Sequence, residues 1–452
     1  MASAPLGDNC SHSSLLLKPS DHAYKVGYKE YTAKQLSNAA GNSKGVTELT
    51  ASFPRPLVLP SDDLSEDPRY PGQSLRSWIR EPHRNEVASG RNVIYVASPP
   101  TISRDIKMMD WWALPEYKNQ GPNITDPGAE MPGADVIEAF LGAFYTGMKI
   151  ARLSPGFSFV SWEKPVSSKA NRQSIPRYIG LRRKGEVVGI RTRPSPDGIF
   201  QVQFNLNDIL DAAISALPAD AYALLLLIHQ DLYEDEEDDF CCGRAYGGSR
   251  VAVVSSARYN PSFDEVQRVE RVHAWPASHC EIYINSACES AGATNKRPSK
   301  KRRTETTIAK ADSKSSSPSS NDRPGPIHAA VEAHHVLPQT NTISTAKSLN
   351  DLWTARVCRT ASHELGHCFG LDHCVYYACV MQSTASMAED VRQPPYLCPV
   401  DFAKLQRATG ATEAEHYAAL AEFCDARGTT HMFAALSAWV KARLLELERR
   451  KL

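Results

Sequence analysis

The sequence predicts a mixed α/β fold, and three observations favour that class. Residues 221–228 form the longest apolar run, and we expect a strand at 223–229 that is buried on both faces. Residues 134–148 carry apolar side chains at four-residue steps, which is typical of a helix packed on a core. Residues 363–373 read HExxHxxGxxH, a pattern that places two histidines on one face of a helix. Strands and helices therefore mix along one chain, as they do in α/β domains.

The elements ahead of the histidine motif follow from local signals. Residues 92–97 are strand-like and are expected to open the folded core. The segment 190–205 predicts a hairpin, because residues 194–198 (PSPDG) are typical of a turn. A helix is expected over 206–217. Further strands are expected at 250–257 and 281–284.

The motif itself requires a long helix, expected over 349–369. Ser348 is a suitable N-cap, and Asp351 lies in the first turn, where the helix dipole favours a negative charge. Residues 412–415 (TEAE) match a capping box and begin another helix. The two C-terminal helices are expected at 413–426 and 430–447, with Gly428 between them.

Composition divides the chain into folded and polar parts. Residues 1–92 are polar and punctuated by proline, so we expect a partly disordered arm there. Residues 93–410 are expected to form the main domain, interrupted at 289–348 by a basic, serine-rich insertion that should be disordered. Residues 411–452 are expected to add a C-terminal helical hairpin.

The insertion contains a basic run at 296–303 (KRPSKKRR). Such a run can be a nuclear import signal bound by an import receptor, a patch that contacts phosphates, or a solvated linker. The sequence leaves these three interpretations open.

Charge and cysteine content narrow the class of protein. The chain has 452 residues, with 51 Lys plus Arg against 51 Asp plus Glu, so no global field recruits nucleic acid or acidic lipid. No apolar run is long enough for a signal peptide or a membrane span. Eleven cysteines without a secretion signal favour free thiols or metal ligation over disulfides. We therefore expect a cytoplasmic or nuclear protein that is not secreted and has no membrane partner.

The HExxHxxGxxH run predicts a catalytic metal site. His363 and His367 share one helical face and can bind one metal ion, and Gly370 can end the helix so that His373 returns as a third ligand. Three imidazoles with an open fourth position are typical of a catalytic zinc site. Glu364 is placed to take a proton from a zinc-activated water, so these groups suffice for amide hydrolysis.

The residues that follow extend the motif to HExxHxxGxxHCxxxxCxM, and a CPVD segment comes later. This stretch closely resembles the archaemetzincin family of zinc metallopeptidases, in the metzincin clan, and weaker resemblance covers 93–410. The resemblance implies a zincin domain with a mixed twisted sheet, an active-site helix and a Met-turn at Met381. It also implies a second, structural zinc held by four thiolates, three of which would be Cys374, Cys379 and Cys398.

This chain departs from the family pattern at Asp401, where the family has the fourth cysteine. A carboxylate can ligate zinc, so a site of three cysteines and Asp401 is possible. Cys358, Cys368 or Cys424 could instead supply the fourth ligand. The remaining alternative is three reduced, buried cysteines that hold no metal.

The resemblance implies hydrolysis of peptide bonds, with small peptides as substrates and an aminopeptidase-like action. The alternative function is a catalytically silent zinc scaffold that binds a protein or nucleic-acid partner. The intact Glu364 argues against a scaffold, because a scaffold needs the ligands but not the base.

Three further groups of residues have weaker interpretations. Residues 234–239 are acidic and form either a solvated loop or a rim that favours substrates with a basic or free amino end. Tyr376 and Tyr377 are candidates to stabilise an oxyanion, on proximity in sequence alone. Three cysteines are expected to be buried or incidental thiols: Cys241, Cys242 and Cys280.

Overall fold

The structure is a computed structural model that describes residues 10–41, 50–115, 130–162, 175–294, 325–343 and 345–450. Its strands and helices are interleaved along the chain, which confirms the predicted mixed α/β class. The basic run at 296–303 lies outside the described residues.

A five-stranded sheet lies at the centre of the fold. In spatial order its strands are β10 (Gly243–Tyr246), β11 (Val251–Ser255), β8 (Ala221–Ile228), β1 (Val93–Ala97) and β3 (Lys149–Arg152). Neighbouring strands are parallel, except that β10 runs antiparallel to β11. Strand β8 is buried along its whole length, as predicted, because Leu225 faces one hydrophobic core and Leu226 faces the other.

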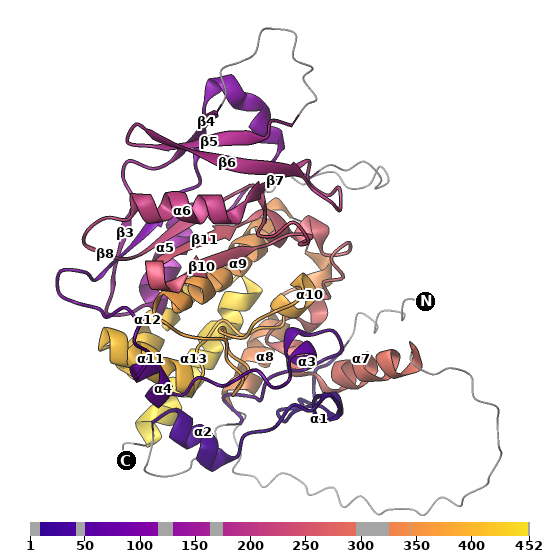
Figure 1. Ribbon diagram of the computed structural model, residues 1–452. Coiled ribbons are helices and arrows are strands. Elements are labelled where there is room, and N and C mark those ends of the chain that lie inside the picture. Colours follow the sequence, from indigo (N-terminus) through magenta and orange to yellow (C-terminus); the bar gives the residue numbers. More distant parts are fainter. Residues whose placement is uncertain are drawn as a thin grey trace, which may run out of the picture.

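A second sheet packs above the first. Its order is β2 (Thr101–Ile102), β4 (Ser158–Ser161), β5 (Tyr178–Arg183), β6 (Glu186–Pro194), β7 (Val202–Asn205) and β9 (Asp231–Tyr233). Strands β6 and β7 form the hairpin predicted at 190–205. Helix α6 (Leu206–Ala216) follows β7 directly, and the Asn205 side chain caps it by accepting a hydrogen bond from the Asp208 amide. Figure 1 shows α6 between the two sheets, where side chains of all three share one core.

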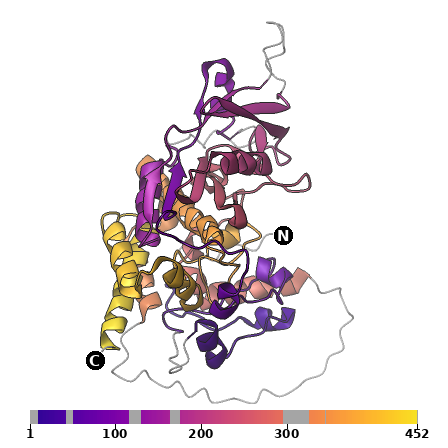
Figure 2. The ribbon, with the colours of Figure 1, turned by 60° about the vertical axis from the view of Figure 1, so that its left-hand side comes forward.

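The other face of the central sheet is covered by helices. Helix α9 (Ala346–Cys368) crosses beneath the sheet beside α5 (Ala134–Phe144), and most of its residues are buried. The chain continues with the helices α8 (Pro326–Val336), α10 (Met387–Asp390), α11 (Pro399–Thr409), α12 (Glu413–Asp425) and α13 (His431–Arg449). Figures 1 and 2 show α12 and α13, in yellow, lying against the lower half of the domain.

The prediction of a polar, partly disordered arm over 1–92 is wrong for the described residues of that segment. They form α1 (Asp21–Val26), α2 (Ala33–Ala39), α3 (Asp63–Glu66) and α4 (Leu75–Ile79). Phe53 is buried against Tyr396 and Trp439, and Trp78 is also buried. Sequence periodicity could not reveal this segment, because its few apolar side chains are widely spaced and insert singly into a core made by other elements.

Two further predictions are wrong between residues 281 and 348. Residues 281–284 are not a strand, since they begin helix α7 (Glu281–Thr294). Helix α8 lies within the stretch predicted as a disordered insertion, and its Ile327 and Ala330 are fully buried. This helix packs mainly on α13, so its apolar face becomes buried only when the tertiary structure forms.

The long histidine-bearing helix begins three residues before the predicted start. Its N-cap is Thr345 rather than Ser348, and the Thr345 hydroxyl accepts a hydrogen bond from the Ser348 amide. The capping box of Thr412 and Glu415 is present at the start of α12, as predicted.

Among the described residues no helix combines the length and apolarity needed to cross a membrane. The short 3-10 helices are η1 (Arg104–Trp111), η2 (Gly247–Ser249), η3 (Ala257–Tyr259), η4 (Pro261–Phe263), η5 (Arg271–His273), η6 (Ala277–His279) and η7 (Thr340–Thr342).

Candidate metal centres

Helix α9 and the loop after it bring together the three histidines of the motif. One ring nitrogen from each of His363, His367 and His373 lies within 4.8 Å of the other two. The Nδ1–H of His363 donates to the Val380 carbonyl at 2.7 Å, and that of His367 donates to the Leu371 carbonyl at 2.8 Å. These bonds fix the tautomers, so both Nε2 atoms, 3.1 Å apart, present lone pairs to each other. Two facing lone pairs repel unless a cation lies between them, which is the arrangement that a metal requires.

The three imidazoles are also held neutral. Burial lowers the pKa of His363 well below its usual range, and the neighbouring His367 and His373 lower it further. Burial likewise lowers the pKa of His367 to about 4, and it lowers the pKa of His373. Neutral imidazole is the form that ligates metal, so the pocket selects the competent protonation state before a metal arrives.

The N-terminal segment holds the turn that carries the third histidine. Gly370 has a positive φ of 73°, which lets the chain leave the helix sharply. Gln73 Nε2 donates to the Gly370 carbonyl at 3.0 Å, and Tyr70 Oη donates to Asp372 Oδ1 at 2.8 Å. Trp78 Nε1 donates to the carbonyl that precedes Gly370 at 2.9 Å. The sequence does not reveal these positioning residues, because they lie about 300 positions away in the chain.

Glu364 lies on the same helix, next to the edge strand β10. It is 7% exposed, and burial raises the pKa of its carboxyl to about 8. A Cβ added to Gly243 would lie 3.3 Å from Glu364 Cγ, and a Cβ added to Gly247 would clash with the His367 carbonyl. Glycine at both positions therefore lets β10 and η2 approach the helix closely. A cation among the histidines would favour the carboxylate form of Glu364 and oppose the effect of burial.

Met381 lies under the histidine-bearing helix, as the Met-turn expectation requires. Its side chain is fully buried, and its sulfur is 2.5 Å from where a Cβ on Gly366 would stand. The carbonyl of Met381 also accepts a hydrogen bond from the Cys374 amide at 2.8 Å. Met381 is therefore part of the floor below the histidines, and its backbone links that floor to the cysteine that follows His373.

The histidines and Glu364 open into a cleft of about 960 Å³. Strand β10 lines one side through Gly243, Arg244 and Ala245. Tyr376 and Tyr377 do not line the cleft; Tyr376 packs on Tyr31 and Tyr377 packs on Phe53. The oxyanion role considered for these two tyrosines is therefore not supported by their position. The acidic residues that line the cleft are Asp63, Glu81, Glu237, Asp238, Asp239, Glu364, Asp372 and Asp390.

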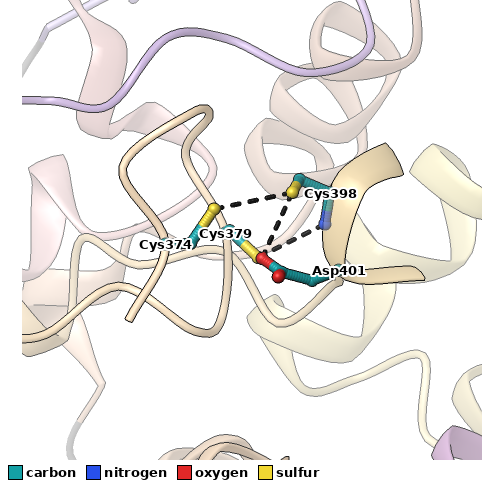
Figure 3. Close-up of side chains that lie close together, drawn as sticks. All are labelled: Cys374, Cys379, Cys398 and Asp401. Carbon is teal, nitrogen blue, oxygen red and sulfur yellow. Dashed lines mark hydrogen bonds between the residues drawn. The ribbon is translucent and has the colours of Figure 1, made fainter. Parts of the chain in front are cut away.

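A second cluster gathers Cys374, Cys379, Cys398 and Asp401, whose donor atoms all lie within 4.8 Å of one another. Figure 3 shows the three sulfurs and the carboxylate turned toward a common centre. The Cys374 and Cys398 sulfurs are 3.6 Å apart, and the thiols of Cys379 and Cys398 each lie 3.3 Å from Asp401 Oδ2. The spare cysteines at 358, 368 and 424 are buried elsewhere and do not belong to this group.

Asp401 has a second partner that the sequence did not suggest. Its Oδ1 accepts a hydrogen bond from Lys404 Nζ at 2.7 Å, and both side chains are 1% exposed. Burial and, after it, the negative charge of Cys374 raise the pKa of Asp401 to about 7, while Lys404 opposes the rise. One carboxylate oxygen thus faces the sulfurs while the other faces an ammonium. Three buried thiols and a buried carboxyl form a donor set that suits a closed tetrahedral zinc site.

Comparison with known proteins agrees with the motif. The model of Peptidase family M54 matches residues 327–407. The archaemetzincin-2 of Pongo abelii is 26% identical over 375 residues, which is 82% of this chain and 74% of the relative. The archaemetzincin-2 of Rattus norvegicus is 43% identical over 70 residues, covering 16% of this chain and 20% of the relative. A further archaemetzincin-2, from Macaca fascicularis, is matched over 47% of its own length.

Among solved structures, the archaemetzincin of Methanopyrus kandleri matches 72% of this chain and 99% of its own, at 15% identity and a TM-score of 0.31. The family-model match includes the whole histidine motif and every member of the cysteine cluster. On these sequence matches and the motif that they cover, the chain is similar to the archaemetzincins, and its residues 327–407 match the model of peptidase family M54.

Proposed function

We propose that this protein hydrolyses peptide bonds with a zinc ion held by His363, His367 and His373 and with Glu364 as the general base. The observation that carries the proposal is the convergence of three neutral imidazoles beside one buried carboxyl at the wall of an open cleft. When bound there, zinc supplies Lewis acidity that polarises a carbonyl and makes a water molecule a better nucleophile at neutral pH.

Glu364 would handle the proton in this reaction. Its carboxylate accepts a proton from the attacking water and returns it to the nitrogen of the leaving amine. Contact with Gly243 and burial under β10 hold the carboxyl in place, so few rotamers compete with the productive one. The hydrogen bonds that His363 and His367 make to backbone carbonyls orient their rings for the same reason.

Strand β10 offers a way to bind an extended peptide. It is an edge strand of the central sheet, and its residues 243–245 line the cleft beside Glu364. An unpaired strand edge can bind a peptide backbone by strand addition, which would place a peptide bond next to the histidines. Peptides with a basic or free amino end are the proposed preference, because eight carboxyls and one arginine, Arg244, line the cleft. Small peptides and an aminopeptidase-like cut fit that preference.

The second cluster is proposed to hold a structural zinc with Asp401 as its fourth ligand. The support is the closed, buried donor set and the direction of Asp401 Oδ2 toward two of the sulfurs. Because Cys374 directly follows His373, such a zinc would also restrain the third histidine.

The proposal is tested by incubating the zinc-loaded full chain with a mixed peptide library and following the products by mass spectrometry. We expect cleavage that a chelator abolishes and added zinc restores, with cuts concentrated near free amino ends or basic residues. A library in which half of the peptides are N-acetylated separates a free-amine requirement from general endopeptidase action. No cleavage of any peptide by protein that contains its full zinc complement would refute the proposed activity.

A further inference from the structure

A third group of metal-type donors lies outside both centres. Cys10, His273 and Cys280 bring two sulfurs and one ring nitrogen within 4.8 Å of one another. The Cys10 and Cys280 sulfurs are 3.5 Å apart, although 270 positions separate them in sequence. None of the three lines the catalytic cleft. Cys280 was expected to be a buried or incidental thiol; it is buried, and two further metal-type donors lie beside it.

The backbone around the cluster is built to keep these residues together. Leu15 forms an antiparallel bridge with Cys280, the Leu16 amide donates to the His279 carbonyl at 2.8 Å, and the Glu281 amide donates to the Ser14 carbonyl at 3.0 Å. The N-terminal segment thus pairs with the junction between η6 and α7, and Cys10 approaches Cys280 as a consequence.

His273 is oriented as metal-ligating histidines are. Its Nδ1–H donates to Glu270 Oε1 at 2.8 Å, and its ring stacks on Tyr283 with centroids 4.4 Å apart. The side chain has no exposed surface, and Nε2 has no hydrogen-bond partner among the described residues. Metal-bound imidazoles usually donate one ring N–H to a carboxylate or carbonyl and leave the other nitrogen free for the metal, as His273 does.

A second histidine lies beside the cluster. His12 lies edge-on to the His273 ring at 5.1 Å between centroids, and its Nδ1 lies 2.6 Å from His335 Nε2. His12 Nε2 is also buried without a hydrogen-bond partner among the described residues, but His12 is not one of the three clustered donors.

We propose that Cys10, Cys280 and His273 Nε2 bind a zinc ion that fastens the N-terminal segment to the η5–η6 loop. Two thiolates and an imidazole are soft and borderline donors that select zinc over calcium or magnesium. The ion would satisfy the buried nitrogen of His273 and replace the thiol protons of both cysteines. The site is separate from the catalytic cleft, so the inference does not rest on the proposed peptidase activity.

The main rival is a disulfide between Cys10 and Cys280. Their sulfurs are 3.5 Å apart, against about 2.0 Å in a disulfide, and a disulfide would leave His273 Nε2 buried without a partner. Metal binding accounts for all three donors, whereas a disulfide accounts for two.

The test measures zinc per full-length chain by inductively coupled plasma mass spectrometry in Cys10→Ser, Cys280→Ser and the double variant. Each should contain one zinc fewer than the parent, and the double variant should also lose only one, because all the changes remove the same ion. Cys288→Ser, on nearby α7 but outside the cluster, is the matched control and should keep the parent count. His273→Gln should lose the same single zinc.

Cobalt loading gives an independent readout. The thiolate-to-cobalt charge-transfer band of the parent should be smaller in Cys10→Ser and unchanged in Cys288→Ser. Peptide turnover by Cys10→Ser should stay within about twofold of the parent, since the site is remote from the cleft. An unchanged zinc count in both single cysteine variants would overturn the proposal. So would a denatured, unreduced parent with two fewer free thiols than the reduced chain, because that result identifies the disulfide.

Discussion

His373 and Cys374 are consecutive residues, yet they belong to two clusters of opposite character. The histidine cluster faces a cleft of about 960 Å³ and offers three nitrogens. The cluster of Cys374, Cys379, Cys398 and Asp401 is buried on all sides and offers three sulfurs and an oxygen. Because neighbouring side chains point in opposite directions, one short segment can serve both an open and a closed centre.

The open histidine cluster is suited to catalysis, whereas the closed cysteine cluster is suited to structural support. A metal site can exchange water and substrate only where it faces solvent, and of the two clusters the histidine cluster lines the cleft. The buried cluster has protein atoms around every donor, so a metal there can restrain the chain but cannot reach a peptide. This contrast predicts that changes in the first cluster alter turnover, whereas changes in the second alter stability first.

The largest effect should come from removing one donor from each cluster. His367→Ala should lose one zinc and all measurable peptide turnover while the melting temperature falls little. Cys379→Ala should lose a different zinc and lower the stability of the whole chain, because a structural metal contributes directly to folding. Zinc content, turnover and thermal melting of both variants check this contrast. If His367→Ala keeps the parent zinc content, His367 is not a ligand.

The second largest effect is expected from Glu364→Gln. This change should reduce kcat by about 10²–10⁴-fold, which is the usual contribution of a general base. The amide matches the carboxyl in shape, so zinc content and melting temperature should stay at the parent values. The change tests the open cluster without disturbing its ligands. Parent-like turnover by Glu364→Gln would show that the carboxyl does not move the proton.

Asp401→Ala should destabilise the chain by about 3–5 kcal/mol, because it leaves the buried Lys404 ammonium without its carboxylate. It should also weaken zinc binding at the second cluster, so that unfolding becomes sensitive to a chelator. Asp401→Cys is the matched control, since a thiolate keeps both the metal ligand and a negative charge near Lys404, and it should recover most of the loss. Denaturant unfolding with and without chelator measures both effects, and equal losses in the two variants would exclude Asp401 as a ligand.

Lys404→Met distinguishes a metal ligand from a simple ion pair. If Asp401 binds zinc, the metal compensates its charge after the lysine is removed, and the zinc-loaded variant should lose only about 1 kcal/mol or less. After chelation the same variant should lose about 3–5 kcal/mol, because the carboxyl is then buried without any partner. An equally large loss of stability in the presence of zinc would mean that Asp401 forms an ion pair with Lys404 and does not bind a metal.

The smallest effect is expected at the floor that the two clusters share. Met381→Leu conserves volume and should cost less than about 1.5 kcal/mol of stability. Because Leu is branched and Met381 contacts the Gly366 position closely, the histidine-bearing helix should shift slightly and turnover should fall a few fold. Thermal melting and steady-state kinetics measure the two changes. A loss of either zinc in Met381→Leu would instead give the side chain a larger role than a hydrophobic floor.

The amino-acid sequence by itself determined the parts of this protein that depend on short spacing. His363 and His367 share a helical face because they are four residues apart, and Gly370 lets His373 follow. Strand β8 is apolar throughout because both of its faces are buried. The capping box at Thr412 and the hairpin of β6 and β7 are equally local signals, and the structure contains both.

Tertiary structure decided what depends on contacts between distant residues. Polar composition hid the packing of 50–92, where Gln73 and Trp78 support the turn below His373. Helix α8 could not be predicted from the sequence, because its apolar face packs mainly on the distant helix α13. The partner of Asp401 and the meeting of Cys10 with Cys280 are likewise products of chain packing. Local periodicity indicates which face of an element is apolar, but not which distant side chain packs against that face. Features of the first kind could therefore be predicted from the sequence, and features of the second kind could not.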